Sequence, residues 1–180
     1  MAEAVTAAAN KILGVKVPLQ GGGFSASSHN AGGFSPQGMF QNGILTSAAG
    51  EQIKLCDISF VCYLSLISLF FCRFSQHHYS GTFCTGNTDI LQNLMSKANI
   101  RTNLGQFAPD IAAVQQQGLT YELGETNSYA CHGAPGVSDT AGAALWGLDY
   151  AFYAAQMGVE RLYFHQGIGY KYNFVRNSLF

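Results

Sequence analysis

The chain has 180 residues, of which only 11% are charged, and its formal net charge is −1. This charge balance gives no basis for binding nucleic acid or an anionic membrane surface. A hydrophobic content of 48% with 21 glycines excludes a disordered chain and fits a buried parallel sheet with glycine-rich loops. One good hydrophobic core can form at this length, but a complete (β/α)8 barrel usually needs about 250 residues.

The cysteines and the N-terminal residues do not indicate a cellular compartment. The five cysteines form no CxxC pair, and their odd number predicts no disulfide framework; they are Cys56, Cys62, Cys72, Cys84 and Cys131. The N-terminal residues lack the basic and apolar regions of a secretory signal peptide.

The first third of the chain predicts helices and strands in alternation. Residues 4–13 are alanine-rich and predict a short helix, and the alternation at residues 15–19 predicts a strand. The glycine run at residues 20–23 is predicted to be a βα loop, because no GKS, GKT or GxGxxG motif follows it. A helix over residues 36–49 and a strand over residues 51–60 are expected next.

Residues 61–76, VCYLSLISLFFCRFSQ, are the most unusual segment. The apolar run at residues 58–72 is shorter than the roughly 18 to 20 residues that span a membrane, so membrane association is not favoured. A membrane-associated protein anchored by that run, or a buried helix, remains an alternative.

We favour the hypothesis that residues 61–76 are a translated retained intron. Pyrimidine-rich codons encode most of these residues, Val61-Cys62 can be written GTATGT like a splice donor, and Gln76 can be CAG like an acceptor. Val175-Arg176 can likewise be GTAAGA, so residues 175–180 are expected to be a read-through tail. Codons without GT at Val61 or AG at Gln76 would discard the hypothesis.

The pair His77-His78 invites a metal interpretation that the spacing does not support. Adjacent residues of a strand point to opposite faces, so one ion rarely binds both. His132 could be a third ligand, but the sequence has no HxH or HExxH spacing. We predict neither a metal nor another cofactor.

The second half of the chain continues the alternation. Helical patterns cover residues 87–98 and 140–157, and a loop and a helix are expected within residues 103–117. Strands are expected at residues 119–123 and 161–165.

Glu125 follows the strand at residues 119–123 and lies within the polar, turn-forming segment GETNS at residues 124–128. In an α/β barrel, catalytic groups lie where the strands end. A carboxylate here is therefore a candidate catalytic group, and a helix N-cap or an ordinary loop glutamate is the alternative. The local pattern alone leaves both interpretations open.

Three motifs decide between them: GETNS, CHGAPGVSDTAGAALWGLDY at residues 131–150, and GVERLYFHQGIGYKYN at residues 158–173. Together they resemble the family 79 glycoside hydrolases, which include β-glucuronidases and heparanase-like enzymes. The resemblance is densest from about residue 118 to 173 and looser back to about residue 15. It implies that Glu125 is the nucleophile of a retaining mechanism, on the seventh strand of a (β/α)8 barrel.

The resemblance also implies the extent of the fold and the site. Residues 1–174 are expected to form a partial (β/α)8 TIM barrel, comprising about strands 5 to 8 with their helices. Tyr79 is expected to hydrogen-bond the nucleophile. The expected substrate-binding residues are His78, Tyr79, Asn127, Ser128, His132, Gly133, His165 and Gln166.

Retaining hydrolysis needs two carboxyl groups about 5 Å apart. The resembled family supplies the acid/base from an Asn-Glu pair at the fourth strand, and this sequence has no such pair. Glu122 is expected on the opposite face of the strand from Glu125. We therefore expect a fragment with the nucleophile but not the acid/base, from a secreted parent that cleaves β-glucuronide linkages of glycans. A noncatalytic carbohydrate-binding half barrel is the alternative.

Overall fold

The computed structural model describes residues 2–14, 20–24, 35–53, 73–86 and 90–174. These residues form one sheet whose four strands are all parallel and lie side by side in chain order. The strands are β1 Gly21–Phe24, β2 Arg73–Thr82, β3 Thr120–Ala130 and β4 Val159–Phe164. Parallel strands in sequential order are the arrangement found in a barrel wall. The α/β class is confirmed, and the sheet is consistent with part of a barrel.

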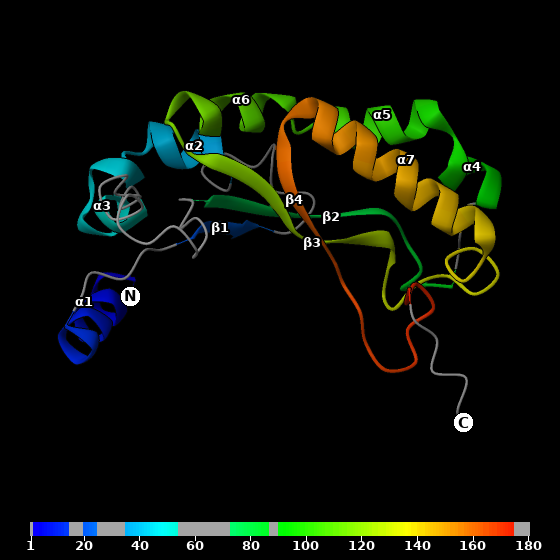
Figure 1. Cartoon of the computed structure of the whole chain (residues 1–180), viewed down its shortest axis with the longest axis horizontal. Coiled ribbons are helices and arrows are strands. Elements are labelled where there is room, and N and C mark those ends of the chain that lie inside the picture. Colours follow the sequence, from blue (N-terminus) through cyan, green and yellow to red (C-terminus); the bar gives the residue numbers. More distant parts are fainter. Residues whose placement is uncertain (1, 15–19, 25–34, 54–72, 87–89, 175–180) are drawn as a thin grey trace, which may run out of the picture.

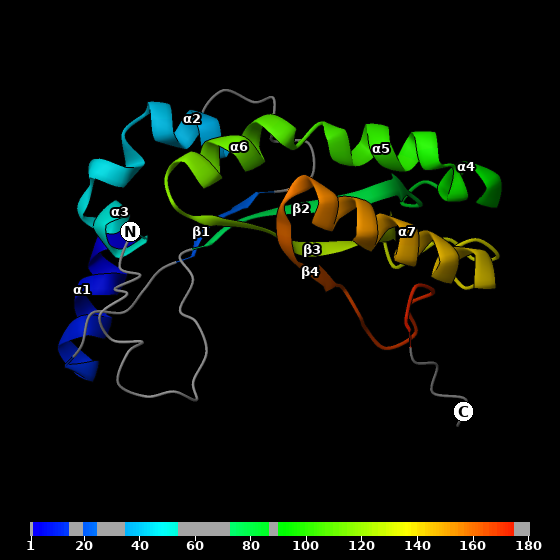
Figure 2. The ribbon, with the colours of Figure 1, turned by 45° about the horizontal axis from the view of Figure 1, so that its top comes forward.

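Helices α2, α4, α5, α6 and α7 lie along one face of this sheet, whereas α1 and α3 lie beyond one end of it (Figures 1 and 2). The bounds are α1 Ala2–Leu13, α2 Pro36–Gln41, η2 Ile44–Thr46, α3 Ala48–Ile53, α4 Leu91–Met95, α5 Lys97–Gly105, α6 Ala108–Gln116 and α7 Ala141–Met157. No helix among the described residues is long and apolar enough to cross a membrane. The membrane-anchor alternative concerns residues 58–72, which lie outside the described ranges.

The N-terminal strand does not lie where the alternating pattern placed it. The predicted strand at residues 15–19 is outside the described residues, and the glycines predicted to be a loop form β1 instead. Gly21 pairs with Phe74 of β2, and a side chain at Gly21 would collide with the Phe74 ring. The glycine run is therefore a strand because it lets the backbone approach β2 closely.

Residues 51–53, predicted to begin a strand, belong to helix α3, and residues 54–60 of that prediction are not described. The strand is β2, which starts at Arg73 and contains His77 and His78. Arg73–Gln76, the last residues of the hypothetical intron, thus form the first part of a central strand.

The predicted helices exist, but their ends differ. The helix expected at 36–49 is interrupted at Gly43, whose φ of 74° is left-handed and separates α2 from the helical turns after it. Ser96 likewise separates α4 from α5 and caps α5 through a hydrogen bond from the Asn99 amide. Helix α7 begins at a Thr140 cap and ends at Gly158, whose φ is 94°.

The hydrophobic core lies between the sheet and the helices. Trp146 and Tyr150 of α7 and the helix-facing Phe74, Tyr121 and Leu123 of the sheet are at most 2% exposed. This packing fixes which face of each strand is buried against helices and which face remains open.

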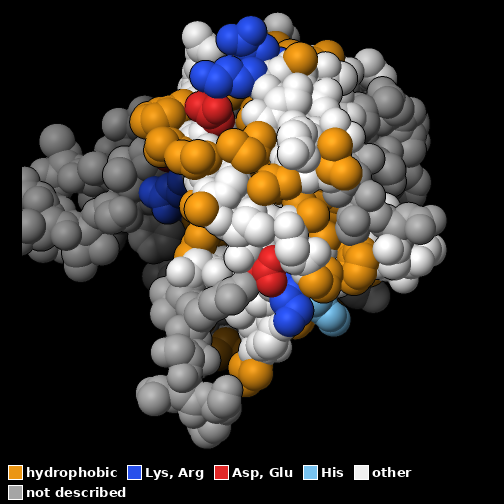
Figure 3. Space-filling model, turned by 90° about the vertical axis from the view of Figure 1, so that its right-hand side faces the viewer, with side chains coloured by type: hydrophobic (Ala, Val, Ile, Leu, Met, Phe, Trp, Pro, Cys, Tyr) orange, Lys and Arg blue, Asp and Glu red, His pale blue; other side chains and the backbone are white. Residues whose placement is uncertain are grey.

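Helix α7 also carries apolar side chains on its outer surface. Leu145, Leu148 and Phe152 are 54–66% exposed and are spaced three and four residues apart, so they form one stripe. Figure 3 views the end of the molecule toward which β2 and β3 run, and hydrophobic side chains predominate over charged ones there.

Candidate functional site

A β-bulge in β3 sets the direction of the candidate nucleophile. Gln76 of β2 pairs with Leu123, but the next residue, His77, pairs with Glu125, so Gly124 is the extra residue. Leu123 and Thr126 both face the helices, since Leu123 lies in the core and Thr126 Oγ1 hydrogen-bonds the Tyr150 hydroxyl of α7 at 2.8 Å. The bulge therefore directs Glu125 to the open face of the sheet, as bulges beside active sites commonly do.

Glycine is required at the bulge. A Cβ built on Gly124 would collide with the Ser75 hydroxyl of the neighbouring strand, and Ser75 is 1% exposed. We predict that Gly124→Ala destabilises the fold by about 1–3 kcal/mol through overpacking, measured by urea unfolding. Adding Ser75→Gly removes the colliding hydroxyl and should restore most of the loss. No recovery in the double variant would contradict this account.

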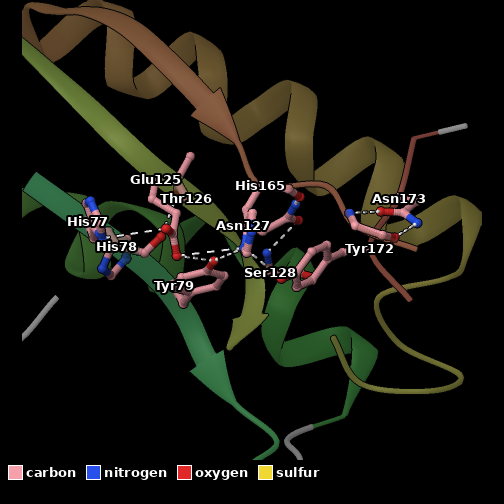
Figure 4. Close-up of polar contacts among 11 residues, drawn as sticks. His77, His78, Tyr79, Glu125, Thr126, Asn127, Ser128, His165, Tyr172 and Asn173 are labelled. Atoms are coloured by element: carbon pink, nitrogen blue, oxygen red, sulfur yellow. Dashed lines mark hydrogen bonds and ion pairs between the residues drawn. The ribbon is translucent and has the colours of Figure 1, made fainter. Parts of the chain in front are cut away.

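The Glu125 carboxylate lies within a polar cluster on the open face (Figure 4). The Tyr79 hydroxyl donates a hydrogen bond of 2.7 Å to Glu125 Oε1, which confirms the expected contact. His165 Nδ1 lies 3.7 Å from the same oxygen, and His77 Nδ1 lies 3.8 Å from Oε2. The side chain of Glu125 is 35% exposed, so the carboxylate is held by its neighbours and still accessible.

The hydroxyl of Tyr79 is a permanent donor in this cluster. Burial raises the pKa of Tyr79 well above its ordinary value, and the hydrogen bonds with Glu125 and Tyr172 raise that pKa further. Burial also raises the pKa of Tyr172. Both phenols therefore keep their protons throughout the physiological range.

Two predicted substrate-binding residues face away from Glu125. His78 is 4% exposed and lies against the helices, with its ring 5.2 Å from the Phe107 ring and stacked 6.3 Å from Tyr150. The Ser128 hydroxyl donates to Ser138 Oγ at 2.7 Å. Both side chains occupy the helix side because strand alternation separates them from Tyr79 and Asn127.

The other predicted residues build the wall beside the cluster. Asn127 Nδ2 donates to the His165 carbonyl at 2.9 Å. The ring of His132 stacks 4.2 Å from Tyr170, and its carbonyl accepts from Lys171 N at 2.7 Å. Gly133, with a φ of 86°, packs so closely on Tyr172 that a Cβ there would lie 2.9 Å from the ring. Gln166 Oε1 accepts from Phe174 N at 3.0 Å.

Of two further residues near Glu125, Tyr172 was expected only at the rim of the cleft, and His77 was not predicted. His77 precedes Tyr79 by two positions and therefore shares its face of β2, so strand alternation could have identified it. Tyr172 is brought to the cluster by the turn after β4, and its hydroxyl lies 3.2 Å from His165 Nδ1. No local pattern marks that contact.

A disulfide joins Cys84 and Cys131, so the prediction of no disulfide was wrong. The two cysteines follow β2 and β3, neighbouring parallel strands that end at the same edge of the sheet. Their Cα atoms are 5.1 Å apart although 47 positions separate them in sequence. This disulfide depends on how the strands pair, so the spacing of the cysteines in the sequence does not predict it.

Glu122 lies on the same face as Glu125, so the expectation of opposite faces was wrong, and the bulge at Gly124 is the reason. Glu122 is 3% exposed and lies 3.7 Å from Arg73 Nη1. Burial raises the pKa of the Glu122 carboxyl above its ordinary value, while Arg73 and then Arg161 oppose that rise in pKa.

This raised pKa predicts a pH-dependent effect of Glu122→Gln. The buried charge costs folding free energy above the folded-state pKa, and the cost vanishes below the ordinary value of 4.5. The free energy of unfolding of the variant should be about 1 kcal/mol higher at pH 7 and unchanged near pH 4. The gain at pH 7 is no larger because loss of the Arg73 pairing offsets part of the benefit. Urea unfolding at the two pH values measures this. A gain in stability at pH 4 that disappears at pH 7 would contradict the raised pKa of Glu122.

No protein-family model matches the chain. The chain is 35% identical over 103 residues to a β-glucuronidase of Neurospora crassa and 35% identical over 102 residues to one of Aspergillus niger. These matches cover 55% and 54% of this chain but 18% and 19% of the relatives, so the matched part spans about a fifth of their length.

A solved structure shows the same similarity. It is a 4-O-α-L-rhamnosyl-β-D-glucuronidase from Fusarium oxysporum 12S in complex with Rha-GlcA, and it is 41% identical in sequence. The TM-score is 0.51, and the alignment covers 56% of this chain and 22% of that one. About half of this chain is therefore similar to a part of known β-glucuronidases.

Proposed function

We propose that this chain supplies the nucleophile part of a retaining β-glucuronidase site, with Glu125 as the nucleophile. One observation carries the proposal: the Glu125 carboxylate is held on the open face of the sheet by Tyr79 at 2.7 Å, with an imidazole beside each oxygen. A carboxylate held this way can attack the anomeric carbon of a sugar and form a glycosyl-enzyme ester. The names of the relatives support a β-glucuronide of a glycan or glycoconjugate as substrate.

The four strands are proposed to be strands 5 to 8 of the barrel, with the acid/base supplied by a strand outside this chain. Glu122 is the other carboxylate on the open face of β3, but it lies roughly 10 Å back along the strand, at about 3.3 Å per residue. It is also engaged by Arg73. Neither feature suits a proton donor about 5 Å from the nucleophile.

Trapping of the glycosyl-enzyme tests the assignment of Glu125. In 2-deoxy-2-fluoro-β-D-glucuronosyl fluoride, the leaving fluoride needs no protonation, so a site without its acid can still be glycosylated. We expect the intact mass to rise by one fluoroglucuronosyl group, and peptide mapping to place that group on Glu125.

Two variants control the trapping experiment. Glu125→Gln should abolish the label because the amide is not a nucleophile. Glu160→Gln removes a carboxylate of similar exposure, 33% against 35%, and should leave the label unchanged. A label that persists in Glu125→Gln, or maps elsewhere, contradicts the proposal.

A noncatalytic carbohydrate-binding half barrel is the second candidate. It is favoured by the single accessible carboxylate of the described open face, together with the Tyr170–His132 stack that a sugar could contact. Calorimetric binding of glucuronate by both the unaltered chain and Glu125→Gln, without trapping in either, would support this candidate.

The hypothesis that residues 61–76 are a retained intron leads to a prediction for the shortened chain. Deleting them places Phe60 directly before His77 and brings Asp57–Phe60 into the sequence positions of Arg73–Gln76. We propose that residues 1–174 without this segment form the partial catalytic domain.

Two of the four replacements fit the contacts of β2, whereas Asp57 and Phe60 would remove the pairing of Arg73 with Glu122 and the hydrogen bond that Gln76 accepts from the Tyr121 hydroxyl. Ser59 would take the position of Ser75 opposite Gly124, and Ile58 that of the buried Phe74. We expect the deletion variant to keep the β2–β3 register and to be labelled at Glu125 at a rate within about twofold of the full chain, since the residues around the carboxylate are unchanged. Loss of labelling with unchanged circular dichroism would contradict this.

A further inference from the structure

His165 touches two tyrosines as well as flanking Glu125. Its Nδ1 atom lies 3.0 Å from the Tyr79 hydroxyl and 3.2 Å from the Tyr172 hydroxyl. Figure 4 shows these side chains converging from β2, the end of β4 and the turn after it. Because one ring nitrogen meets two hydroxyl groups, the position of its proton determines which contacts are favourable.

The backbone of His165 is anchored on both sides, which holds the ring in place. His165 N donates to the Thr126 carbonyl at 3.0 Å, and the His165 carbonyl accepts from Asn127 Nδ2 at 2.9 Å. The ring also packs edge-on against Tyr170, with centroids 5.5 Å apart. The 3.0 Å contact with Tyr79 is therefore built into the fold.

The protons of the cluster can be assigned by counting donors. Tyr79 has one hydroxyl proton, and it is used in the 2.7 Å bond to the Glu125 carboxylate, which can only accept. The Tyr79 oxygen therefore presents lone pairs to His165. A bare Nδ1 would present another lone pair at 3.0 Å, whereas a protonated Nδ1 donates to the Tyr79 oxygen.

We propose that His165 carries its proton on Nδ1 and is a positioning residue for Glu125, acting through the Tyr79 hydroxyl. The inference rests on the proposed role of Glu125 and assigns His165 a task other than contacting substrate. The hydrogen bonds run from His165 Nδ1–H to the Tyr79 oxygen, and from the Tyr79 hydroxyl to Glu125 Oε1. Consecutive bonds polarise one another, so the first strengthens the second and orients the carboxylate.

This tautomer has two further consequences. Nε2 is left as an acceptor, able to receive a hydrogen bond from a sugar hydroxyl. The Tyr172 proton is not needed by Nδ1, because a protonated Nδ1 no longer accepts a hydrogen bond.

The tautomer is measured directly by long-range ¹H–¹⁵N NMR on ¹⁵N-histidine-labelled full chain, with His165→Gln to assign the signal. Sedimented protein can be measured by magic-angle spinning, so solubility does not limit the test. We expect Nδ1–H in the neutral ring. An Nε2–H tautomer in the unaltered chain overturns the proposal.

Two phenylalanine variants form a matched pair. Tyr79→Phe removes the acceptor oxygen, so the proton should move to Nε2 and Nδ1 should accept from Tyr172. Tyr172→Phe removes the other hydroxyl and should leave the proton on Nδ1. The reverse pattern would overturn the proposal, and so would a tautomer that neither variant changes.

The functional link is tested by the rate of Glu125 trapping. His165→Leu should slow labelling about tenfold, the effect of losing one hydrogen bond of the chain. His165→Asn, whose amide can place an N–H near the Nδ1 position, should restore most of that rate. Equal rates in both variants would contradict the positioning role. If no variant is labelled at all, the proposed function fails, while the NMR result still decides the tautomer.

Discussion

The isolated 180-residue chain should show no turnover of 4-nitrophenyl β-D-glucuronide above that of its Glu125→Gln variant. A positioned general acid contributes about 10²–10⁴ to such a reaction, and the described open face offers Glu125 without a partner at the required distance. Nitrophenolate leaves with little protonation, so Glu125 could form the glycosyl-enzyme once, but hydrolysis of that intermediate needs the same missing residue as a general base. Absorbance at the nitrophenolate band, followed with both proteins at equal concentration, checks the result.

A leaving-group series separates a missing acid from a misfolded site. The chain should react with the glucuronosyl fluoride and not with methyl β-D-glucuronide, because only the second needs protonation. Robust turnover of the nitrophenyl glucuronide that Glu125→Gln abolishes would show that the chain carries its own acid and would contradict the fragment hypothesis.

The end strands of the described sheet predict poor solubility. β1 and β4 are the end strands of the described sheet, and unpaired edges of parallel strands recruit other chains. The apolar stripe on α7, which includes Phe152 at 66% exposed, adds to this tendency. We expect oligomers or aggregates in size-exclusion chromatography, and a monodisperse monomer would contradict this expectation.

Breaking the disulfide should have the largest effect on stability. The bond between Cys84 and Cys131 closes a loop spanning 47 positions, for which chain entropy predicts about 4 kcal/mol. The double variant Cys84→Ser, Cys131→Ser should unfold at a correspondingly lower urea concentration, and dithiothreitol should lower the midpoint of the unaltered chain equally. Non-reducing peptide mapping verifies the pairing, and dithiothreitol should not shift the midpoint of the double variant.

The disulfide should also affect the site, because Cys131 and His132 have positive φ values of 63° and 74°. Non-glycine residues need surrounding contacts to hold that conformation, and here the disulfide and the Lys171 amide supply them. We expect reduction to loosen the stack of His132 on Tyr170, measured as faster hydrogen exchange at Lys171. Unchanged unfolding and exchange after reduction would contradict a structural role for the bond.

The sequence alone predicted those features that depend on local residues. Helix α7 begins and ends within a few residues of the predicted bounds because Thr140 caps it and Gly158 takes the left-handed conformation that stops it. The resemblance of the GETNS motif and the two motifs after it to a glycosidase family pointed to Glu125. Strand alternation would have added His77, because it lies two positions before Tyr79 on the same strand.

Only the tertiary structure decided which side chains share the site. The bulge at Gly124 breaks the alternation that separates Glu122 from Glu125 in sequence, and it exists because β3 must pair with β2 across Ser75. The Cys84–Cys131 bond arises because parallel strands bring distant segments to one edge, and Tyr172 reaches His165 through the turn after β4. Local pattern sets the elements, whereas pairing between strands sets their faces, and for this reason the surroundings of Glu125 could not be read from the chain.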